Sequence, residues 1–492
     1  MRRIFLLTMR HIRLEVAMRR SLVVALAVTI LAGCATGPRY ERPAVELPAA
    51  WKDAPAQGQS ALGERWWSLY GDPVLDRLVA EGLERNRDLA IAAARIDEAR
   101  AVLRITDAER LPAVDVTAQR DRTRSSARSS VPLPPGVALT RNSNQATVNV
   151  SYELDLWGRL RSASDAARAE LLATQSARQT VRIALVNQIV QSYHTLLALD
   201  RQVAVTQRTI EVRARDLELQ RKRYDAGLIA DFNLRQLEAE VAAARAQLPG
   251  IRQRRTAEEV ALLTLLGRTP RAIVEEALAF ADDRGQLPND VVPEGLPSDL
   301  LLRRPDIVDV EQRLIATNAR IAAARASLFP RIALTGYLGG ESASLADLFT
   351  APARIWQLAF GLAQPIFQGG RLRGEVQAAE AREQQAVAQY QKTVQTAFGE
   401  VREALSAQVR ARETHAAENA RVAALTETLR LARIRYENGL SSQLEVLDAE
   451  RNLLQAELNR IDALRAQRAA VADLVRALGG GWQGELEEVT KR

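Results

Sequence analysis

The chain has 492 residues, of which 47% are hydrophobic, 26% charged and only 4% aromatic. So few aromatic residues argue against one large conventional core, and the abundance of alanine, arginine and glutamate is typical of long helices. The net charge is +7, but residues 1–33 hold six arginines and one acid, which leaves 61 basic and 59 acidic residues in 34–492. Because this remainder is balanced and mixed in sign, we expect no nucleic-acid partner.

The N-terminal segment predicts a lipoprotein signal peptide over residues 1–33. MRRSLVVALAVTILAGC, from Met18 to Cys34, has two arginines, an apolar stretch and a Leu-Ala-Gly-Cys end. The apolar run is shorter than the roughly 20 residues that span a bilayer, as in a cleaved signal. Its end resembles a bacterial lipobox, which implies a covalent lipid on Cys34, and Ala35 favours the outer membrane. Whether the chain starts at Met1 or Met18 stays open.

The first half of the chain, residues 76–267, predicts a helix, a β-hairpin and two further helices. A proline-rich segment over 34–75 leads into a helical pattern over 76–110. The hairpin is predicted over 113–157, because apolar and polar residues alternate there with period two. In its return strand, Val148 and Val150 lie on the apolar face; the polar face holds Asn149, Ser151, Glu153 and Asp155.

Long helices follow this hairpin. The stretch after Arg159 has no proline before Pro249, and it predicts a helix over 159–226, roughly 100 Å long at 1.5 Å per residue. A return helix is predicted over 231–266. Stacked end to end, that helix and the helix over 76–110 would match the length of the long one.

The second half, residues 307–479, repeats this plan after a linker over 268–306. A helix ends at Phe329-Pro330, a hairpin is predicted over 331–368, and a tail over 480–492 closes the chain. The remaining two helices are predicted over 371–438 and 443–478.

The two halves are an internal duplication. RYDAGLIADF begins at Arg223 and RYENGLSSQL begins at Arg435, 212 positions later, and residues 148–267 align with 360–479 without an insertion. This period is far longer than that of solenoid repeats. We therefore expect two similar halves that complete one symmetric object.

The four amphipathic strands per chain predict a homotrimer. About ten tilted residues are enough to cross a membrane, but four strands cannot close a barrel, and open edges are not tolerated in lipid. Eight strands from a dimer would enclose only side chains, whereas twelve from a trimer leave a channel. A soluble sandwich is the alternative, and the lipobox and the matched long helices argue against it.

Several segments resemble signatures of the outer membrane factor (TolC) family, in its lipidated efflux (NodT-type) branch. They are CATGPRYERP, WWSLYGDPVLDRLV, LPSDLLLRRPDIVDVEQRL and RYENGLSSQLEVLDAE. The resemblance implies an α+β membrane protein, a TolC-like trimer. It would have a 12-stranded outer-membrane β-barrel, a long periplasmic α-helical barrel and a mixed equatorial domain, formed by residues 40–73, 268–306 and the C-terminus.

The resemblance also implies partners. The protein would join a periplasmic adaptor and an inner-membrane pump, often of the resistance-nodulation-division type, and would sit among outer-membrane lipids. Small molecules would leave the cell through it. It implies no cofactor beyond the covalent lipid on Cys34.

The duplicated decapeptides would then form two helix–turn–helix tips at the periplasmic mouth. The family implies that adaptor hairpins dock on the Gly-Leu motifs, which are Gly227, Leu228, Gly439 and Leu440. Glycine suits a helix end that needs a positive φ. A tyrosine–acid network closes the family's mouth, and the matching residues are Tyr436, Glu445, Asp448 and Asp231, with Asn233 where the family often has an acid. The strength and ion selectivity of this gate stay open.

Other function classes have less support. The three histidines, His11, His194 and His415, do not match across the duplication, and GGRLRG lacks the Lys-Ser/Thr ending of a phosphate-binding loop, so we expect no enzyme and no metal site. Apolar residues recur at heptad spacing in the last helix, as at Leu447, Leu454 and Ile461. A structural coiled-coil protein would explain this spacing but neither the hairpins nor the lipobox. An outer-membrane conduit of a type I protein secretion system has the same fold and stays open, as do the exported substrate and the identity of the pump.

Overall fold

The computed structural model describes residues 37–278 and 300–482, apart from 39, 50, 52–62, 129, 131–133 and 135. The predicted signal peptide, Cys34, much of the linker and most of the C-terminal tail lie outside the described residues. The described residues divide into two units, the first within 37–43, 97–172 and 311–389 and the second within 44–96, 173–310 and 390–482.

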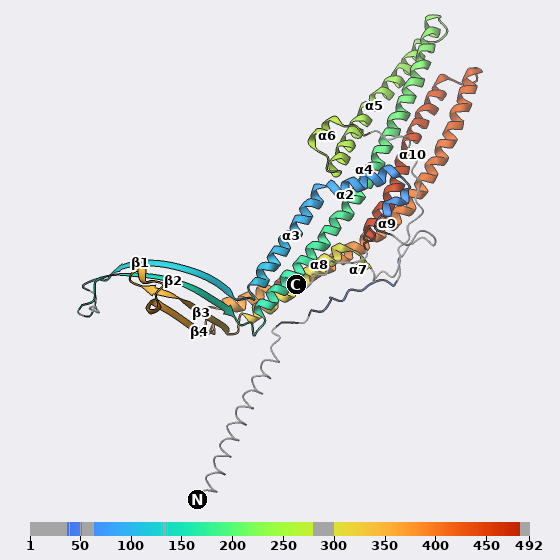
Figure 1. The fold of residues 1–492 in the computed structure, drawn as a ribbon. Helices are drawn as coiled ribbons and strands as arrows, with labels where there is room; N and C mark the ends of the chain where they lie inside the picture. Colours follow the sequence, from blue (N-terminus) through green and yellow to red (C-terminus); the bar gives the residue numbers. More distant parts are fainter. Residues whose placement is uncertain are drawn as a thin grey trace. The chain divides into compact units, whose positions relative to one another are not determined.

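The first unit contains a four-stranded antiparallel sheet with strand order β1-β2-β3-β4 (Figure 1). The strands are β1 (Ala113–Arg124), β2 (Thr140–Glu153), β3 (Arg331–Ser342) and β4 (Arg354–Ala363). Val148 lies opposite Val116 on one side and Leu338 on the other, and Leu338 lies opposite Trp356. Because opposed residues point to the same face, one apolar face runs across all four strands.

The two faces of the sheet differ as the sequence predicts. On the apolar face, Trp356 and Leu358 are 73% and 78% exposed. The opposite face is polar, and there the hydroxyls of Thr117 and Thr147 lie 2.9 Å apart, and the Asn149 amide donates to Thr117 at 3.0 Å. The sheet therefore exposes a broad hydrophobic surface that water would not favour.

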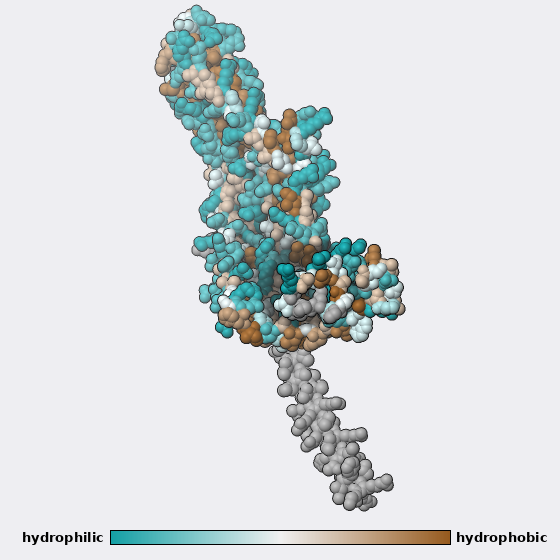
Figure 2. Space-filling model, turned by 90° about the vertical axis from the view of Figure 1, so that its left-hand side faces the viewer, coloured by the Kyte–Doolittle hydropathy of each residue, from teal (hydrophilic) through white to brown (hydrophobic). Residues whose placement is uncertain are grey.

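The long helices come in equal pairs. They are α4 (Arg159–Asp225) and α9 (Arg371–Glu437), with 67 residues each, and α5 (Asp231–Leu265) and α10 (Gln443–Ala477), with 35 each. Each ends one residue before its predicted end. At about 1.5 Å per residue, α4 and α9 are roughly 100 Å long. Hydrophilic residues dominate the visible surface of these helices, with hydrophobic ones scattered among them (Figure 2).

The helix predicted over 76–110 is two helices in the structure, α2 (Pro73–Arg85) and α3 (Arg87–Ala108). They divide at Asn86, which has extended backbone and whose side-chain oxygen accepts from the amides of Asp88 and Leu89 at 2.8 and 3.2 Å. This oxygen caps α3, because asparagine competes well for the unpaired amides of a helix start.

The second repeat has the corresponding division. There α7 (Leu300–Arg303) and α8 (Pro305–Ala326) flank Arg304, so α8 begins two residues before the predicted helix start at 307. Pro305 disfavours a helical conformation for the residue before it, and this explains the break.

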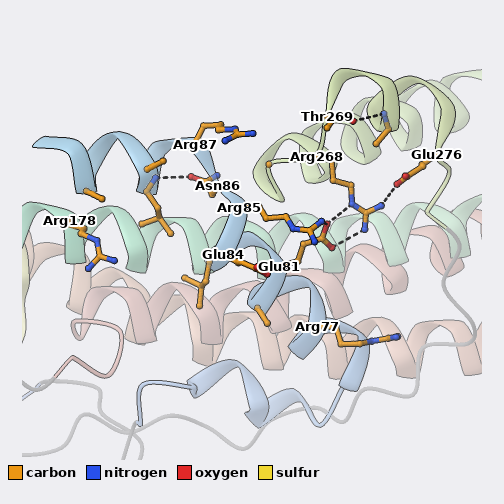
Figure 3. Close-up of a pocket in the computed structure, with 17 residues that line it drawn as sticks. Arg77, Glu81, Glu84, Arg85, Asn86, Arg87, Arg178, Arg268, Thr269 and Glu276 are labelled. Carbon is orange, nitrogen blue, oxygen red and sulfur yellow. Dashed lines mark hydrogen bonds and ion pairs between the residues drawn. The ribbon is translucent and has the colours of Figure 1, made fainter.

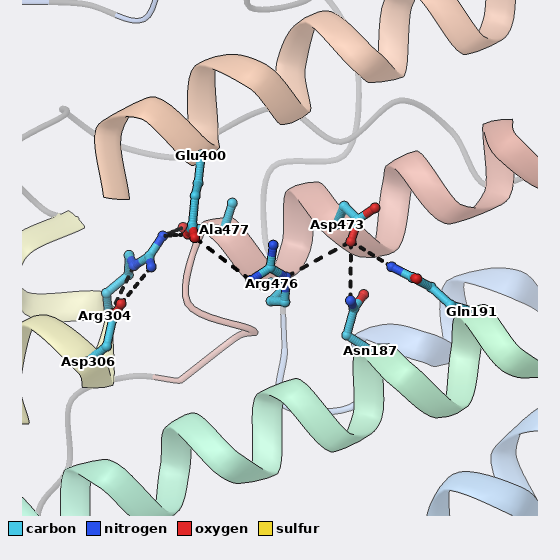
Figure 4. Close-up of polar contacts among 8 residues, drawn as sticks. All are labelled: Asn187, Gln191, Arg304, Asp306, Glu400, Asp473, Arg476 and Ala477. Atoms are coloured by element: carbon cyan, nitrogen blue, oxygen red, sulfur yellow. Dashed lines mark hydrogen bonds and ion pairs between the residues drawn. The ribbon is translucent and has the colours of Figure 1, made fainter. Parts of the chain in front are cut away.

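Both breaks pack against the end of a return helix in the second unit. Asn86, which Figure 3 labels at the first break, donates from its amide to the carbonyl of Leu265 at 2.9 Å. The Arg304 guanidinium donates to the carbonyl of Ala477 at 3.0 Å (Figure 4). Leu265 and Ala477 are 212 positions apart. The duplication is therefore repeated in tertiary contacts.

Arg304 also holds two carboxylates in the second unit. It donates to Asp306 at 2.6 and 3.0 Å and to Glu400 at 2.7 Å (Figure 4). Burial alone lowers the pKa of this guanidinium, but the hydrogen bonds to Asp306 and Glu400 outweigh burial and raise the pKa. In the same unit, the buried Tyr70 of η1 (Trp66–Tyr70) donates to the carbonyl of Arg468 at 2.7 Å.

Short elements complete the described chain, and they are α6 (Pro270–Glu275), η3 (Leu345–Asp347) and η4 (Ala351–Ala353). Among the described helices, none combines the length and hydropathy needed to cross a bilayer.

Candidate functional site

The duplicated decapeptides form the turns between α4 and α5 and between α9 and α10. Gly227 and Gly439 have φ of 74° and 71°, in the left-handed region. The amide of Leu228 donates to the Arg223 carbonyl at 2.8 Å, and the amide of Leu440 makes the equivalent bond at 2.8 Å. These six-to-one bonds are those of a Schellman cap. This cap needs a residue with positive φ, a conformation that glycine adopts at little steric cost. Both turns therefore have the same backbone.

Each turn exposes two large apolar side chains at matching positions. Leu228 and Leu440 are 69% and 71% exposed, and Phe232 and Leu444 are 73% and 54% exposed. Phe232 and Leu444 are again 212 positions apart, and sequence reasoning had not singled them out. Exposed apolar groups in pairs are typical of surfaces that contact another protein.

The five predicted gate residues do not form one cluster within the described chain. No hydrogen bond or ion pair joins any two of Asp231, Asn233, Tyr436, Glu445 and Asp448 in the part that the structure describes. Asp231 lies 3.3 Å from Arg235 of its own helix, and Asp448 lies 2.6 Å from Arg451 of its own helix. The backbone amides of Asn233 and Glu445 donate to the carbonyls of Ala230 and Ser442 at 3.1 and 3.2 Å.

Tyr436 is the gate residue that joins the two hairpins of the chain. Its ring packs on the cluster of Ala432, Val446 and Ala449. Its hydroxyl accepts a hydrogen bond of 3.4 Å from Gln220 of α4. The bond is long and therefore weak.

Each hairpin also has an internal ion pair at the same place. Arg221 of α4 donates to Glu238 of α5 at 2.7 Å, and Arg433 of α9 donates to Glu450 of α10 at 2.7 Å. These pairs are related by 212 positions. Hydrogen bonds from Arg221 and then Arg235 lower the pKa of Glu238. The match of Glu238 with Glu450 across the duplication could have indicated these ion pairs from the sequence alone.

A buried arginine connects the two hairpins. Arg213 of α4 has a side chain only 3% exposed, and its Nη1 lies 3.2 Å from both the carboxylate and the carbonyl of Glu240 in α5. Its Nε lies 3.7 Å from Glu450 of α10, and Arg451 of α10 lies 3.7 Å from Glu240. We call Arg213, Glu240, Arg433, Glu450 and Arg451 the Arg213 cluster.

The Arg213 cluster was not predictable from the duplication. The position equivalent to Arg213 is Leu425, so no repeat signal marks it. Nε and Nη2 of Arg213 make no hydrogen bond in the described structure. A buried charge with incomplete hydrogen bonding depends strongly on its remaining partners.

The described residues hold no group of three histidine, cysteine or acidic side chains that could bind a metal ion.

A sequence model of the family described as outer membrane efflux protein matches residues 78–268 and 296–480. The chain belongs to this family. The resemblance drawn from the sequence signatures is thereby confirmed.

Individual members resemble this efflux protein over nearly their whole length. OprJ of Pseudomonas aeruginosa, an outer membrane protein, is 39% identical over 467 residues, which are 94% of this chain and 96% of OprJ. TtgC of Pseudomonas putida, a probable efflux pump outer membrane protein, is 36% identical over 480 residues, or 96% of this chain and 98% of TtgC. The crystal structure of the Campylobacter jejuni CmeC outer membrane channel matches with a TM-score of 0.88 at 25% identity, covering 92% of this chain and 96% of that one.

The predicted fold class is confirmed by the crystal structures of CmeC and of CusC, which are TolC-like channels, mostly helical with a small sheet. The efflux protein is an outer-membrane channel that extends into the periplasm. Its family is one of transport channels, for which no cofactor is expected.

Proposed function

We propose that three copies of this efflux protein close a 12-stranded barrel in the outer membrane. The continuous apolar face across all four strands carries this proposal, because a strand face that meets lipid is apolar and exposed in this way. In the described sheet, β1 and β4 each have a neighbour on one side only. Edges of this kind must pair in lipid, and twelve strands leave a water-filled channel lined by the polar face.

The oligomeric state tests this proposal directly. Native mass measurement of the detergent-purified protein should give three copies of the lipidated chain, and planar bilayers should show a conducting channel. A stable dimer or monomer with no conductance would contradict the barrel.

We propose that the channel completes a tripartite efflux system with a periplasmic adaptor and an inner-membrane pump. The adaptor would dock on Gly227, Leu228, Gly439 and Leu440, because the two turns expose apolar side chains in equivalent positions. Replacing both leucines with serine should abolish efflux and crosslinking to the adaptor while the trimer still assembles. Val274→Ser, at an apolar residue 85% exposed on α6, is the matched control and should leave efflux unchanged.

We propose that Asp231, Asn233, Tyr436, Glu445 and Asp448 restrict the periplasmic mouth in the trimer. Acids from three chains repel one another, so a closed ring depends on the partners or cations that these side chains bind. Removing side chains removes those interactions, and the ring would then open. Exposed pairs are individually worth only about 0–1 kcal/mol, and threefold repetition multiplies this small term. The double variant Tyr436→Phe with Glu445→Ala should raise single-channel conductance and weaken block by divalent cations. If both stay unchanged in an assembled trimer, the constriction lies elsewhere.

We also propose that Cys34 carries the lipid anchor. Mass spectrometry of the mature N-terminus should find an acylated cysteine at this position. Removing the lipid should weaken anchoring without preventing trimer formation, because the strands insert by their own apolar face. A free thiol on Cys34, or cleavage at another site, would refute this assignment.

We propose that the cargo consists of small molecules and that the chain has no catalytic activity of its own. TtgC, a relative of this chain, is a probable efflux pump outer membrane protein, and this supports export of small molecules over protein secretion. Deleting the chain should increase sensitivity to toxic small molecules and leave the secreted proteins unchanged. Loss of a secreted protein without a change in sensitivity would favour the type I secretion conduit instead.

A further inference from the structure

Four arginines without an assigned role lie at one end of the sheet, on its apolar face. Arg120, Arg122 and Arg124 continue β1 beyond Val114 and Val116, and every second residue of a strand points to the same face. Arg354 of β4 belongs to this face as well, because it lies opposite Gly340, which lies opposite Ala146 in β2. All four arginines are exposed.

These arginines have no anionic partner in the described structure. No hydrogen bond or ion pair of their side chains occurs within the residues that the structure describes. The acidic residues of the strands at this end, Asp121 and Glu341, lie opposite Ser143 and Gln145 and therefore point to the other face. A third acidic residue, Asp347, belongs to the connection between β3 and β4 and is exposed. On the strands themselves, the apolar face thus ends in a cationic band, which is available for an anion.

An apolar groove of about 410 Å³ lies beside this band. It is lined by Val116, Val148, Leu338, Leu348, Phe349 and Arg354, among others. Phe349 is 86% exposed, whereas Leu348 is buried against the sheet. A Cβ on Gly340 would overlap the carbonyl oxygen of Leu348, so glycine allows this loop to cross the sheet closely. The groove therefore combines an apolar wall with a guanidinium.

In the proposed barrel, the end of the sheet that carries the arginines faces the cell exterior. Residues 125–139 and 343–353 connect the strands there, whereas the other strand ends lead into α3, α4, α8 and α9. The helices of this efflux protein extend into the periplasm, so the connecting loops lie at the opposite, outer leaflet. Phosphorylated glycolipids make up that leaflet in outer membranes.

We propose that the groove and the four arginines bind a phosphorylated glycolipid of the outer leaflet. An acyl chain fills the groove, and its headgroup phosphates contact Arg354 on one side and Arg120 and Arg122 on the other. Arg354 and β1 are separated by three strand spacings, or roughly 14 Å, which suits a headgroup with two separate phosphates. Arginine recognises phosphate through paired, charge-assisted hydrogen bonds. The inference rests on the proposed insertion of this sheet in the membrane.

Native mass spectrometry of the detergent-purified, delipidated full-length protein tests the proposal. The probes are a deep-rough lipopolysaccharide, the same molecule with its phosphates removed, and phosphatidylglycerol. The test variant is Arg120→Gln with Arg122→Gln and Arg354→Gln. Arg141→Gln is the matched control, because Arg141 lies opposite Thr123 at the same end of the sheet but on the polar face.

We expect the triple variant to bind the phosphorylated glycolipid about tenfold or more weakly than the wild type, because it loses several charge-assisted bonds. The Arg141→Gln control should bind as the wild type does. Equal binding by the triple variant and the control, or equal binding of the dephosphorylated molecule, would overturn the proposal. So would equally tight binding of phosphatidylglycerol, because the site would then recognise charge and not a glycolipid.

A second variant tests the groove without changing any charge. Ala146→Phe would fill the groove, of which Ala146 forms part of the wall, and it should weaken glycolipid binding while the arginines remain. Unchanged binding would exclude the groove as the acyl site. Trimer mass and single-channel conductance are measured for each variant. A protein that forms no trimer refutes the proposed function, whereas an assembled, conducting wild type that binds no glycolipid refutes only this inference.

Discussion

Replacing Arg213 with methionine tests whether the Arg213 cluster holds the two hairpins of one chain together. The substitution keeps a long side chain but removes a buried guanidinium that lies 3.2 Å from Glu240 and 3.7 Å from Glu450. Both carboxylates keep a second arginine, at 3.7 Å for Glu240 and 2.7 Å for Glu450. The loss should therefore be below the 3–5 kcal/mol typical of a fully unpaired buried charge.

A single hydrogen bond to a charged group contributes about 1.5–3 kcal/mol, and this is the expected cost for each chain. At 1.4 kcal/mol per factor of ten, the separated hairpins should become about 10 to 150 times more populated. Hydrogen exchange of α5 and α10 near the turns measures such local opening. We also expect higher mean single-channel conductance, because separated hairpins would obstruct the mouth less.

Arg221→Met is the matched control for this prediction. Arg221 is 59% exposed and its ion pair with Glu238 lies within one hairpin, so its removal should cost only about 0–1 kcal/mol. Combining Arg213→Met with Glu450→Gln gives the coupling energy. Equal effects of the two arginine variants, or strictly additive effects of Arg213→Met and Glu450→Gln, would refute the role assigned to Arg213.

Three further substitutions test other parts of the fold. Gly267→Ala should destabilise the protein by about 2–5 kcal/mol, because Gly267 has a φ of 69° and the new Cβ would overlap the carbonyl oxygen of Arg85. Gly227→Ala is the control: Gly227 has a similar φ but open space around it, so the substitution should cost only about 1–2 kcal/mol. Thermal melting of the trimer compares the two variants. Arg304→Met should lower the melting temperature and speed proteolysis at the break before α8, because Asp306 and Glu400 would lose a shared cation; a melt that matches the wild type would contradict this. Leu358→Arg should block assembly in the outer membrane, because an arginine on a lipid-facing surface costs about 2–4 kcal/mol. Gln357→Arg, on the opposite, polar face, should assemble normally. Equal yields of the two variants in membrane fractions would show that the apolar face does not meet lipid.

Local patterns in the sequence were enough to predict the repeating elements. A helix without proline needs only its own hydrogen bonds and a stripe of apolar residues, so α4 and α9 were predicted to within one residue of their ends. The alternation of side chains along a strand is a property of the backbone, and so Val148 and Asn149 could be assigned to opposite faces. The positive φ of Gly227 could be predicted in the same way, because glycine often ends a helix in a left-handed conformation before the next helix begins.

Contacts between distant residues depended on the tertiary structure. The break at Asn86 is stabilised by a bond to the Leu265 carbonyl, 179 positions away, and the periodicity of the helix continues through it. Arg213 meets Glu450 only because α4 and α10 pack together, and its repeat partner is a leucine. A local pattern determines how a segment folds, but the pairing of a buried charge depends on which segment covers it. For this reason the sequence by itself determined the duplicated helices and strands, and only the tertiary structure decided how the two hairpins are joined.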